Sequence, residues 1–95
     1  MKKRLEKLRE LVRLQEYEIS THANEEMSND ELVAIDVENA ILTGKIEKRF
    51  TRDPRGRRYE VLGKACDTRP IAVVCRIGRN GRLLIITVYA LEVEA

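Results

Sequence analysis

Residues 71–89 read IAVVCRIGRNGRLLIITVY, two apolar runs joined by a turn sequence. The runs at 71–75 and 83–89 are apolar at nearly every position, which is typical of strands covered on both faces. Asn80-Gly81, between them, is a preferred sequence for the two-residue turn of a β-hairpin. The segment therefore predicts two antiparallel strands at the centre of a sheet.

Two further strands are predicted upstream of this hairpin. Residues 45–50 place Ile46 and Phe50 on one side of a strand, and residues 58–65 form another, in which Gly63 suggests a bulge or bend. The Asp-Pro and Arg-Gly steps between them predict a loop. Together with the hairpin, these segments give an antiparallel sheet of about four strands connected in sequence order.

The N-terminal half is predicted to be mainly helical. Residues 2–16 carry apolar side chains at intervals of three and four, the pattern of an amphipathic helix. Residues 17–19 are expected to be extended, and Ser20 or Thr21 is a suitable N-cap for a second helix, which carries His22.

A third helix is predicted to begin at Val33 or Ile35 and to end at Thr43, where Gly44 stops it. Helices that precede a run of strands in the chain are typical of an α+β fold. We therefore predict an α+β domain in which N-terminal helices pack on the antiparallel sheet, mainly on one face.

The chain length of 95 residues allows one domain, predicted to span 1–95. Within it we expect a leading amphipathic helix at 1–16, a helical part at 17–44 and the sheet at 45–91. A hydrophobic content of 43% with 36% charged residues is ordinary for a globular protein and excludes a disordered chain. No apolar run approaches the roughly 20 residues of a membrane span. We therefore expect a soluble, cytoplasmic protein.

Positive charge is concentrated in one segment. The whole chain has a net charge of +2, but residues 48–58 hold six lysines and arginines against the single carboxylate of Asp53, which leaves the rest of the chain net negative. Arginine presents a planar fork that binds phosphate at two points and stays charged at any physiological pH. The arginines predicted to bind RNA are Arg49, Arg52, Arg57 and Arg58.

Arg55 stands out within this segment because Pro54 stiffens its position and Gly56 allows a ligand to approach the backbone. Two other interpretations of the segment remain open. The arginines can prevent a solvated edge strand from pairing with other chains and so reduce aggregation. Alternatively, they can form a basic surface that binds an acidic partner.

His22 is the only histidine, and its ordinary pKa suits proton transfer near neutral pH. It lies in the first turn of a predicted helix, where backbone N–H groups attract anions. Tyr89, near the end of the last strand, can stack on a base or donate a phenolic hydrogen bond. The structural alternatives are a surface histidine beside an N-cap and a tyrosine at the edge of the core.

Cys66 and Cys75 are the only cysteines, and both lie in apolar, strand-like sequence. Reduced structural thiols are the favoured interpretation, although two facing strands also permit a disulfide. A zinc site needs about four ligands, and one histidine is all that remains to add to the two thiols. Because there is also no nucleotide-binding motif, we expect neither a metal nor a cofactor.

Six segments occur here in a recognisable order: ISTHA at 19–23, DVENAILTGKI at 36–46, DPRG at 53–56, VLGK at 61–64, RPIAVV at 69–74 and ITVY at 86–89. This set resembles the bacterial domain-of-unknown-function family four-two-five-eight. Members of that family look like RelE/barnase-like toxins partnered by MqsA-like zinc-binding antitoxins.

The resemblance implies a compact RelE/barnase-like α+β fold and a metal-independent endoribonuclease. The recurring histidine, arginine and tyrosine of the family correspond here to His22, Arg55 and Tyr89. The chain departs from the family at Ala72, where relatives often carry a histidine, and in the residues after Tyr89. Ala72 thus removes one imidazole that could serve as an acid or base in the family pattern.

We therefore expect a toxin of a type II toxin–antitoxin system that cleaves mRNA by attack of the 2′-hydroxyl. His22, Arg55 and Tyr89 would be catalytic and would converge on one pocket. The expected partners are RNA and a cognate antitoxin, a small zinc-binding, DNA-binding protein, and the leading helix offers a surface for self-association. The alternative is a non-catalytic module that binds protein or RNA through its arginine-rich edge.

Overall fold

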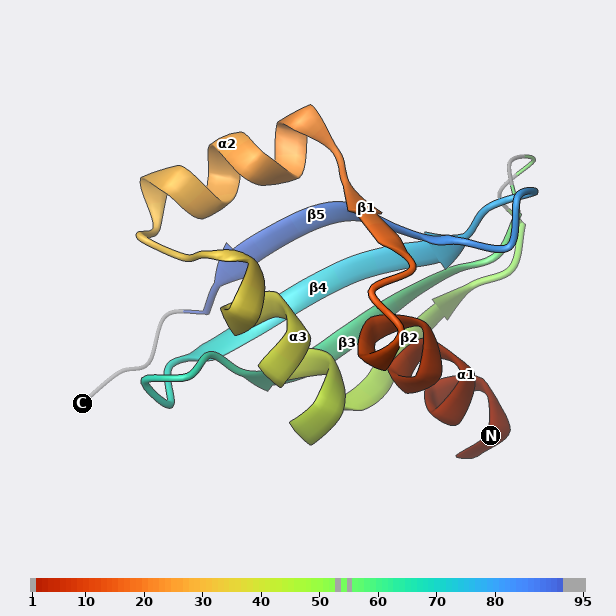
Figure 1. Ribbon diagram of the computed structural model, residues 1–95, viewed down its shortest axis with the longest axis horizontal. Helices are drawn as coiled ribbons and strands as arrows, with labels where there is room; N and C mark the ends of the chain where they lie inside the picture. The colour runs from red at the N-terminus through yellow and green to blue at the C-terminus, as the bar shows by residue number, and fades with distance from the viewer. Residues whose placement is uncertain (1, 53, 55, 92–95) are drawn as a thin grey trace.

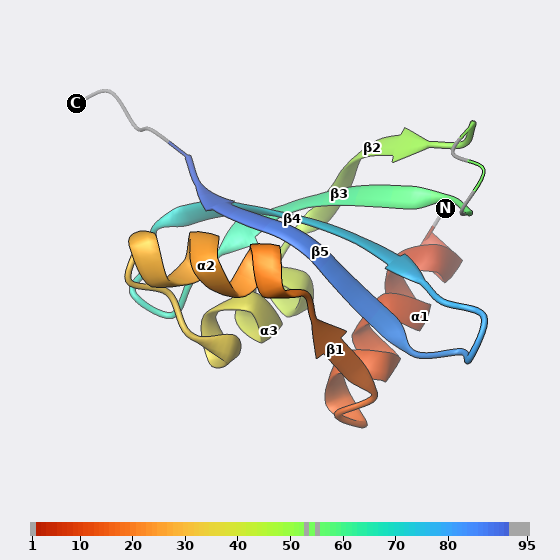
Figure 2. The ribbon, with the colours of Figure 1, turned by 90° about the horizontal axis from the view of Figure 1, so that it is seen from above.

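Three helices lie on one face of a five-stranded sheet (Figures 1 and 2). The computed structural model describes residues 2–52, 54 and 56–91, with the backbone alone for Lys2. None of the helices in this described part is long and apolar enough to cross a membrane. In chain order the elements are α1 (Lys2–Arg13), β1 (Tyr17–Ile19), α2 (Thr21–Asn29), α3 (Ala34–Thr43), β2 (Lys45–Phe50), β3 (Arg58–Lys64), β4 (Pro70–Ile77) and β5 (Leu83–Ala90).

The strands are arranged in the order β1-β5-β4-β3-β2. Strands β2 to β5 are antiparallel and follow one another, so the α+β prediction with N-terminal helices is confirmed. The sheet has one strand more than expected, because the extended residues 17–19 pair in parallel with β5, from Tyr17 opposite Leu83 to Ile19 opposite Ile85.

The middle strand of the sheet is β4. Its sequence predicted cover on both faces, but the helices cover only one, and Val74 and Arg76 on the other face are only partly buried. Ile71, Ala72 and Val73 have no exposed surface. Gly81 adopts the left-handed backbone conformation, with φ of +80°, that the turn between β4 and β5 requires. The hairpin was correctly predicted from Asn80-Gly81, but its loop is longer than a two-residue turn. The Gly78 N–H donates to the Arg82 carbonyl oxygen at 2.8 Å, so residues 79–81 lie between the paired ends.

The core lies between the helices and one face of the sheet. Helix α1 buries Leu8, Leu11 and Val12 but leaves Leu14 56% exposed, because the helix ends at Arg13 rather than at the predicted residue 16. Gln15 then turns the chain with a positive φ of 59°. The buried residues facing the helices from the sheet are Tyr59, Val61, Ile71, Val73, Cys75, Leu83, Ile85 and Val88.

Strand β2 contains a bulge that the sequence does not reveal. The pairing with β3 shifts between Ile46 and Lys48, so Ile46 lies opposite Val61 and Phe50 lies opposite Arg58. The inserted residue changes the alternation of faces. The prediction that Ile46 and Phe50 share one side was therefore wrong.

Gly63 does not mark a bulge, one of the two alternatives predicted for it, because pairing with β4 continues through Gly63 opposite Ile71. Its role is a close contact with α3: a Cβ atom at Gly63 would lie 2.0 Å from the carbonyl oxygen of Ala40. Gly44 is equally confined, since a Cβ there would lie 2.2 Å from the carbonyl oxygen of Leu62. The two glycines allow α3 to pack directly against the backbone of β3.

Strand β1 pairs only with the first residues of β5, and side chains of α2 cover the rest of that edge. Glu26 Oε1 accepts a hydrogen bond from the Val88 N–H at 3.1 Å, and Asp30 Oδ2 accepts one from the Ala90 N–H at 3.0 Å. Ser20 caps α2 as predicted, with its Oγ accepting from the Ala23 N–H at 3.0 Å. The carboxylates thus take the place of a further strand and protect the edge from pairing with another chain.

Asp30→Ala is expected to leave the Ala90 N–H without its acceptor and to lower the free energy of unfolding by about 1 kcal/mol. Hydrogen exchange of the Ala90 amide, followed by NMR, should become faster than in the parent chain. Glu25→Ala removes the same charge from an exposed position of the same helix and should leave this exchange rate unchanged. An unaltered rate in Asp30→Ala would contradict the edge-capping role.

The two cysteines are free thiols in different surroundings. Cys75 is in the core, where burial raises its pKa to about 12. Cys66 is exposed in the turn after β3, so its predicted place in strand-like sequence was wrong. Its N–H donates to the Asp36 carboxylate at 2.9 Å, which fixes this turn against the start of α3.

Candidate nucleic-acid interface

A hollow of about 430 Å³ lies between the start of α1 and the β2–β3 hairpin. A smaller hollow beside it shares three of the lining residues and reaches Ile77 at the end of β4. We call the larger hollow the basic pocket. Its lining residues are Lys3, Arg4, Arg49, Thr51, Arg57 and Tyr59.

Helix α1 is held in place at this pocket by contacts further along its length. The Arg9 guanidinium donates to the carbonyl oxygens of Ile41 at 3.1 Å and Gly44 at 3.0 Å, at the C-terminal end of α3. A cation at this position also interacts favourably with the dipole of α3. These contacts, with the buried leucines of α1, fix the first turn of α1 beside the hairpin.

The strand register supplies the other wall. Arg49 of β2 lies directly opposite Tyr59 of β3, so the two side chains are neighbours on the same face. Arg57 immediately precedes β3. The pocket therefore combines residues that are far apart in the sequence but adjacent across one hairpin and one helix end.

The four cations of the basic pocket form no ion pair with any described carboxylate. The ion pairs of α1 are Lys7 with Glu10 and Arg9 with Glu6, further along the helix. The first turn of α1 contains no acidic residue, so its N–H groups add to the positive potential. This part of the surface is therefore suited to an anion.

Tyr59 is the buried member of the pocket. Its side chain is 4% exposed, and the Arg4 guanidinium lies 5.6 Å from its ring centroid. No described residue forms a hydrogen bond with the Tyr59 hydroxyl. A ligand oxygen in the pocket would supply an acceptor for this hydroxyl.

The structure brings together two of the four arginines predicted to bind RNA, Arg49 and Arg57. Arg58 instead lies over the Phe50 ring, at 5.1 Å from its centroid, and Arg52 is exposed in the loop after β2. Arg55 lies outside the described residues. Lys3, Arg4 and Tyr59 were not predicted as site residues. The basic start of the first helix is the sequence signal for Lys3 and Arg4.

His22 lies away from this pocket, in the first turn of α2. Its side chain is 66% exposed, and its Nε2 is 3.4 Å from Glu26 Oε1. Because α2 packs against β5, strands β4 and β3 lie between His22 and the strand that carries Arg49. The structure therefore does not place His22 with Arg49 and Arg57.

Tyr89 follows Val88, whose N–H donates to Glu26 Oε1. Because Val88 points into the core, the Tyr89 side chain lies on the face of the sheet away from the helices. The Tyr89 hydroxyl donates to Glu60 Oε2 of β3 at 3.2 Å. Burial raises the pKa of Tyr89, and the carboxylate of Glu60 raises it further. The phenol therefore stays protonated and can act as a donor.

Within the described part of the chain, no cluster of three or more His, Cys, Asp or Glu side chains is arranged to hold a metal ion. The chemistry that the basic pocket offers comes from fixed positive charge and hydrogen-bond donors.

Comparison with protein families finds one match, to the family model described as Domain of unknown function (DUF4258), over residues 19–90. No curated protein and no solved structure matches the chain. Helix α1 lies outside the matched residues, so Lys3 and Arg4 come from a part of the chain that the family model does not cover.

Proposed function

The chain belongs to the DUF4258 family, and we propose that it is an RNA-binding module that holds the backbone of a single strand in its basic pocket. The observation that carries this proposal is that four cations, which pair with no carboxylate of the described residues, surround one hollow together with the Tyr59 hydroxyl.

Each feature of the pocket matches a group of the RNA backbone. The forked guanidinium groups of Arg49 and Arg57 can bind phosphate oxygens at two points. The Tyr59 hydroxyl can donate to a third oxygen. Thr51 places a hydroxyl at the same hollow, where it can exchange hydrogen bonds with the 2′-hydroxyl that distinguishes RNA from DNA.

The proposal is tested by the binding of a fluorescently labelled single-stranded RNA, measured by anisotropy at several salt concentrations. If all four cations contact phosphates, the logarithm of the affinity should fall against the logarithm of salt with a slope of about −3. Arg57→Ala should make this slope shallower by about one. Arg13→Ala, at the exposed end of α1 away from the pocket, should leave it unchanged.

Absence of RNA binding, or binding whose strength does not depend on salt, would contradict the proposal. If DNA of the same sequence binds equally well, the phosphate contacts remain supported, but the role assigned to Thr51 is wrong.

A second candidate function is the metal-independent endoribonuclease of a toxin–antitoxin pair, with a small zinc-binding antitoxin as its partner. The observation that favours it is the presence of His22, Glu26 and Tyr89 near the end of β5. In this proposal, His22 takes the proton of a 2′-hydroxyl, the 2′-oxygen bonds to phosphorus, and the bond from phosphorus to the 5′-oxygen breaks. The proton then passes to the leaving oxygen.

Cleavage is tested by incubating the purified chain with RNA in the presence of a chelator. The nuclease proposal predicts products ending in a 2′,3′-cyclic phosphate and a 5′-hydroxyl, with cleavage about 10²-fold slower or more in His22→Ala. Tyr89→Phe should also slow cleavage while retaining the fold. Intact RNA after incubation with the parent chain would contradict the nuclease proposal and leave the binding proposal standing.

A further inference from the structure

A second cluster of arginines lies at the turn of the β4–β5 hairpin, around a hollow of about 350 Å³. Arg82 is fixed there, since its Nε is 3.6 Å from Glu18 Oε1 and it donates to the carbonyl oxygen of Tyr17 at 3.2 Å. Arg76 and Arg79 form no ion pair with any described carboxylate. We call Arg76 and Arg79 together the β4–β5 arginine site.

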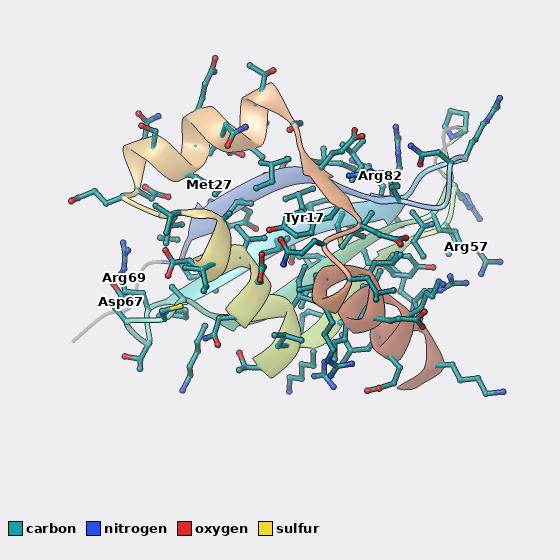
Figure 3. The ribbon with its side chains drawn as sticks, viewed as in Figure 1. Tyr17, Met27, Arg57, Asp67, Arg69 and Arg82 are labelled. Atoms are coloured by element: carbon teal, nitrogen blue, oxygen red, sulfur yellow. The ribbon has the colours of Figure 1, made fainter. Side chains whose placement is uncertain are left out.

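This site lies at the same end of the sheet as the basic pocket. The β3–β4 register places Tyr59 opposite Cys75, so β4 continues past the basic pocket toward its own turn. Ile77 lines the extension of the basic pocket on the helix face, while its neighbour Arg76 lines the second hollow. Because successive residues of a strand face opposite sides, the two hollows lie on opposite faces at the same end of the sheet. Figure 3 shows Arg57 and Arg82 toward this end, opposite to Asp67 and Arg69.

Positive charge at this end of the molecule is therefore present on both faces of the sheet rather than confined to one hairpin. Both hollows open beside the final residues of β4, and Glu18 is the only carboxylate among their described lining residues. Glu18 is itself paired with Arg82, so the charges of Arg76 and Arg79 remain available to a ligand.

We propose that one single-stranded RNA crosses this end of the sheet, with one phosphate in the basic pocket and a later phosphate of the same strand at the β4–β5 arginine site. The inference rests on the proposed RNA-binding function. It adds a second contact point and hence a length requirement, because a ligand with a single phosphate cannot occupy both places.

The test compares two ligands, a dinucleotide with a single phosphodiester and a single strand of about eight nucleotides, a length within the usual site sizes of single-strand binders. Arg79→Ala should weaken binding of the longer strand by about tenfold and leave binding of the dinucleotide unchanged. Arg57→Ala should weaken binding of both ligands. Arg13→Ala is the matched control for the loss of one exposed arginine, and circular dichroism checks that each variant is folded.

The outcomes separate this inference from the function on which it rests. If Arg57→Ala weakens binding but Arg79→Ala does not, the second contact point is wrong and the basic pocket stands. If Arg79→Ala weakens the dinucleotide as much as the longer strand, the two hollows are not separate contact points and the inference is again wrong. If neither variant changes binding, both proposals are wrong.

Discussion

The double variant Arg49→Ala/Arg57→Ala is expected to bind single-stranded RNA about 100-fold more weakly than the parent chain. The loss of one charge-assisted hydrogen bond to phosphate lowers the binding free energy by about 1.5 kcal/mol or more. Two such losses together give this factor. Both side chains line the basic pocket and are exposed, so their removal takes charge from the site without opening the core.

The measurement is the dissociation constant from anisotropy at one fixed salt concentration, because affinities at different salt concentrations are not comparable. The matched control is Arg13→Ala/Lys64→Ala, which removes two exposed cations outside the pocket. Thermal unfolding should be nearly the same for both double variants. Equal RNA affinity in the two would show that the pocket is not the place where RNA binds.

Gly63→Ala is expected to lower the free energy of unfolding by about 3 kcal/mol, at the upper end of the range for overpacked sites. The added Cβ would lie 2.0 Å from the Ala40 carbonyl oxygen and 2.7 Å from the Ala40 Cα, so the obstructing atoms are backbone. No side-chain rotation can relieve this clash, and α3 must move away from β3.

Urea unfolding followed by circular dichroism measures this loss. Gly78→Ala is the matched control, since the nearest atom to its added Cβ is Asn80 Oδ1 at 3.1 Å, a side-chain atom that can shift at the cost of its hydrogen bond from the Arg82 N–H. We expect a clearly smaller loss of stability there. Equal stability of Gly63→Ala and the parent chain would contradict the direct packing of α3 on β3.

Most of the fold could be predicted from the sequence because its signals are local. The apolar runs and Asn80-Gly81 gave the central hairpin, and Ser20 gave the start of α2. The parts that were missed depend on contacts between distant segments. Three residues at 17–19 carry no pattern that reveals parallel pairing with β5, and the bulge in β2 and the contact of Gly63 with Ala40 exist only once the elements pack.

The candidate site was predicted only in part for the same reason. The arginine-rich segment was found from charge alone, and two of its members line the pocket. Lys3 and Arg4 join them because α1 docks on α3 through Arg9, a contact spanning more than thirty residues of sequence. The expected convergence of His22 with the arginines requires a topology in which α2 lies near β2, whereas α2 packs against β5.

The central claim, that an RNA phosphate binds among Lys3, Arg4, Arg49, Arg57 and Tyr59, is tested most directly by NMR titration of the labelled chain with a short single-stranded RNA. We predict that the largest shifts occur at the backbone amides of Arg4, Arg57 and Tyr59 and at the side-chain Nε–H groups of the pocket arginines. The amides of α2, including His22, should change little in comparison. Shifts concentrated in α2 and at the end of β5, with the pocket unchanged, would contradict the claim.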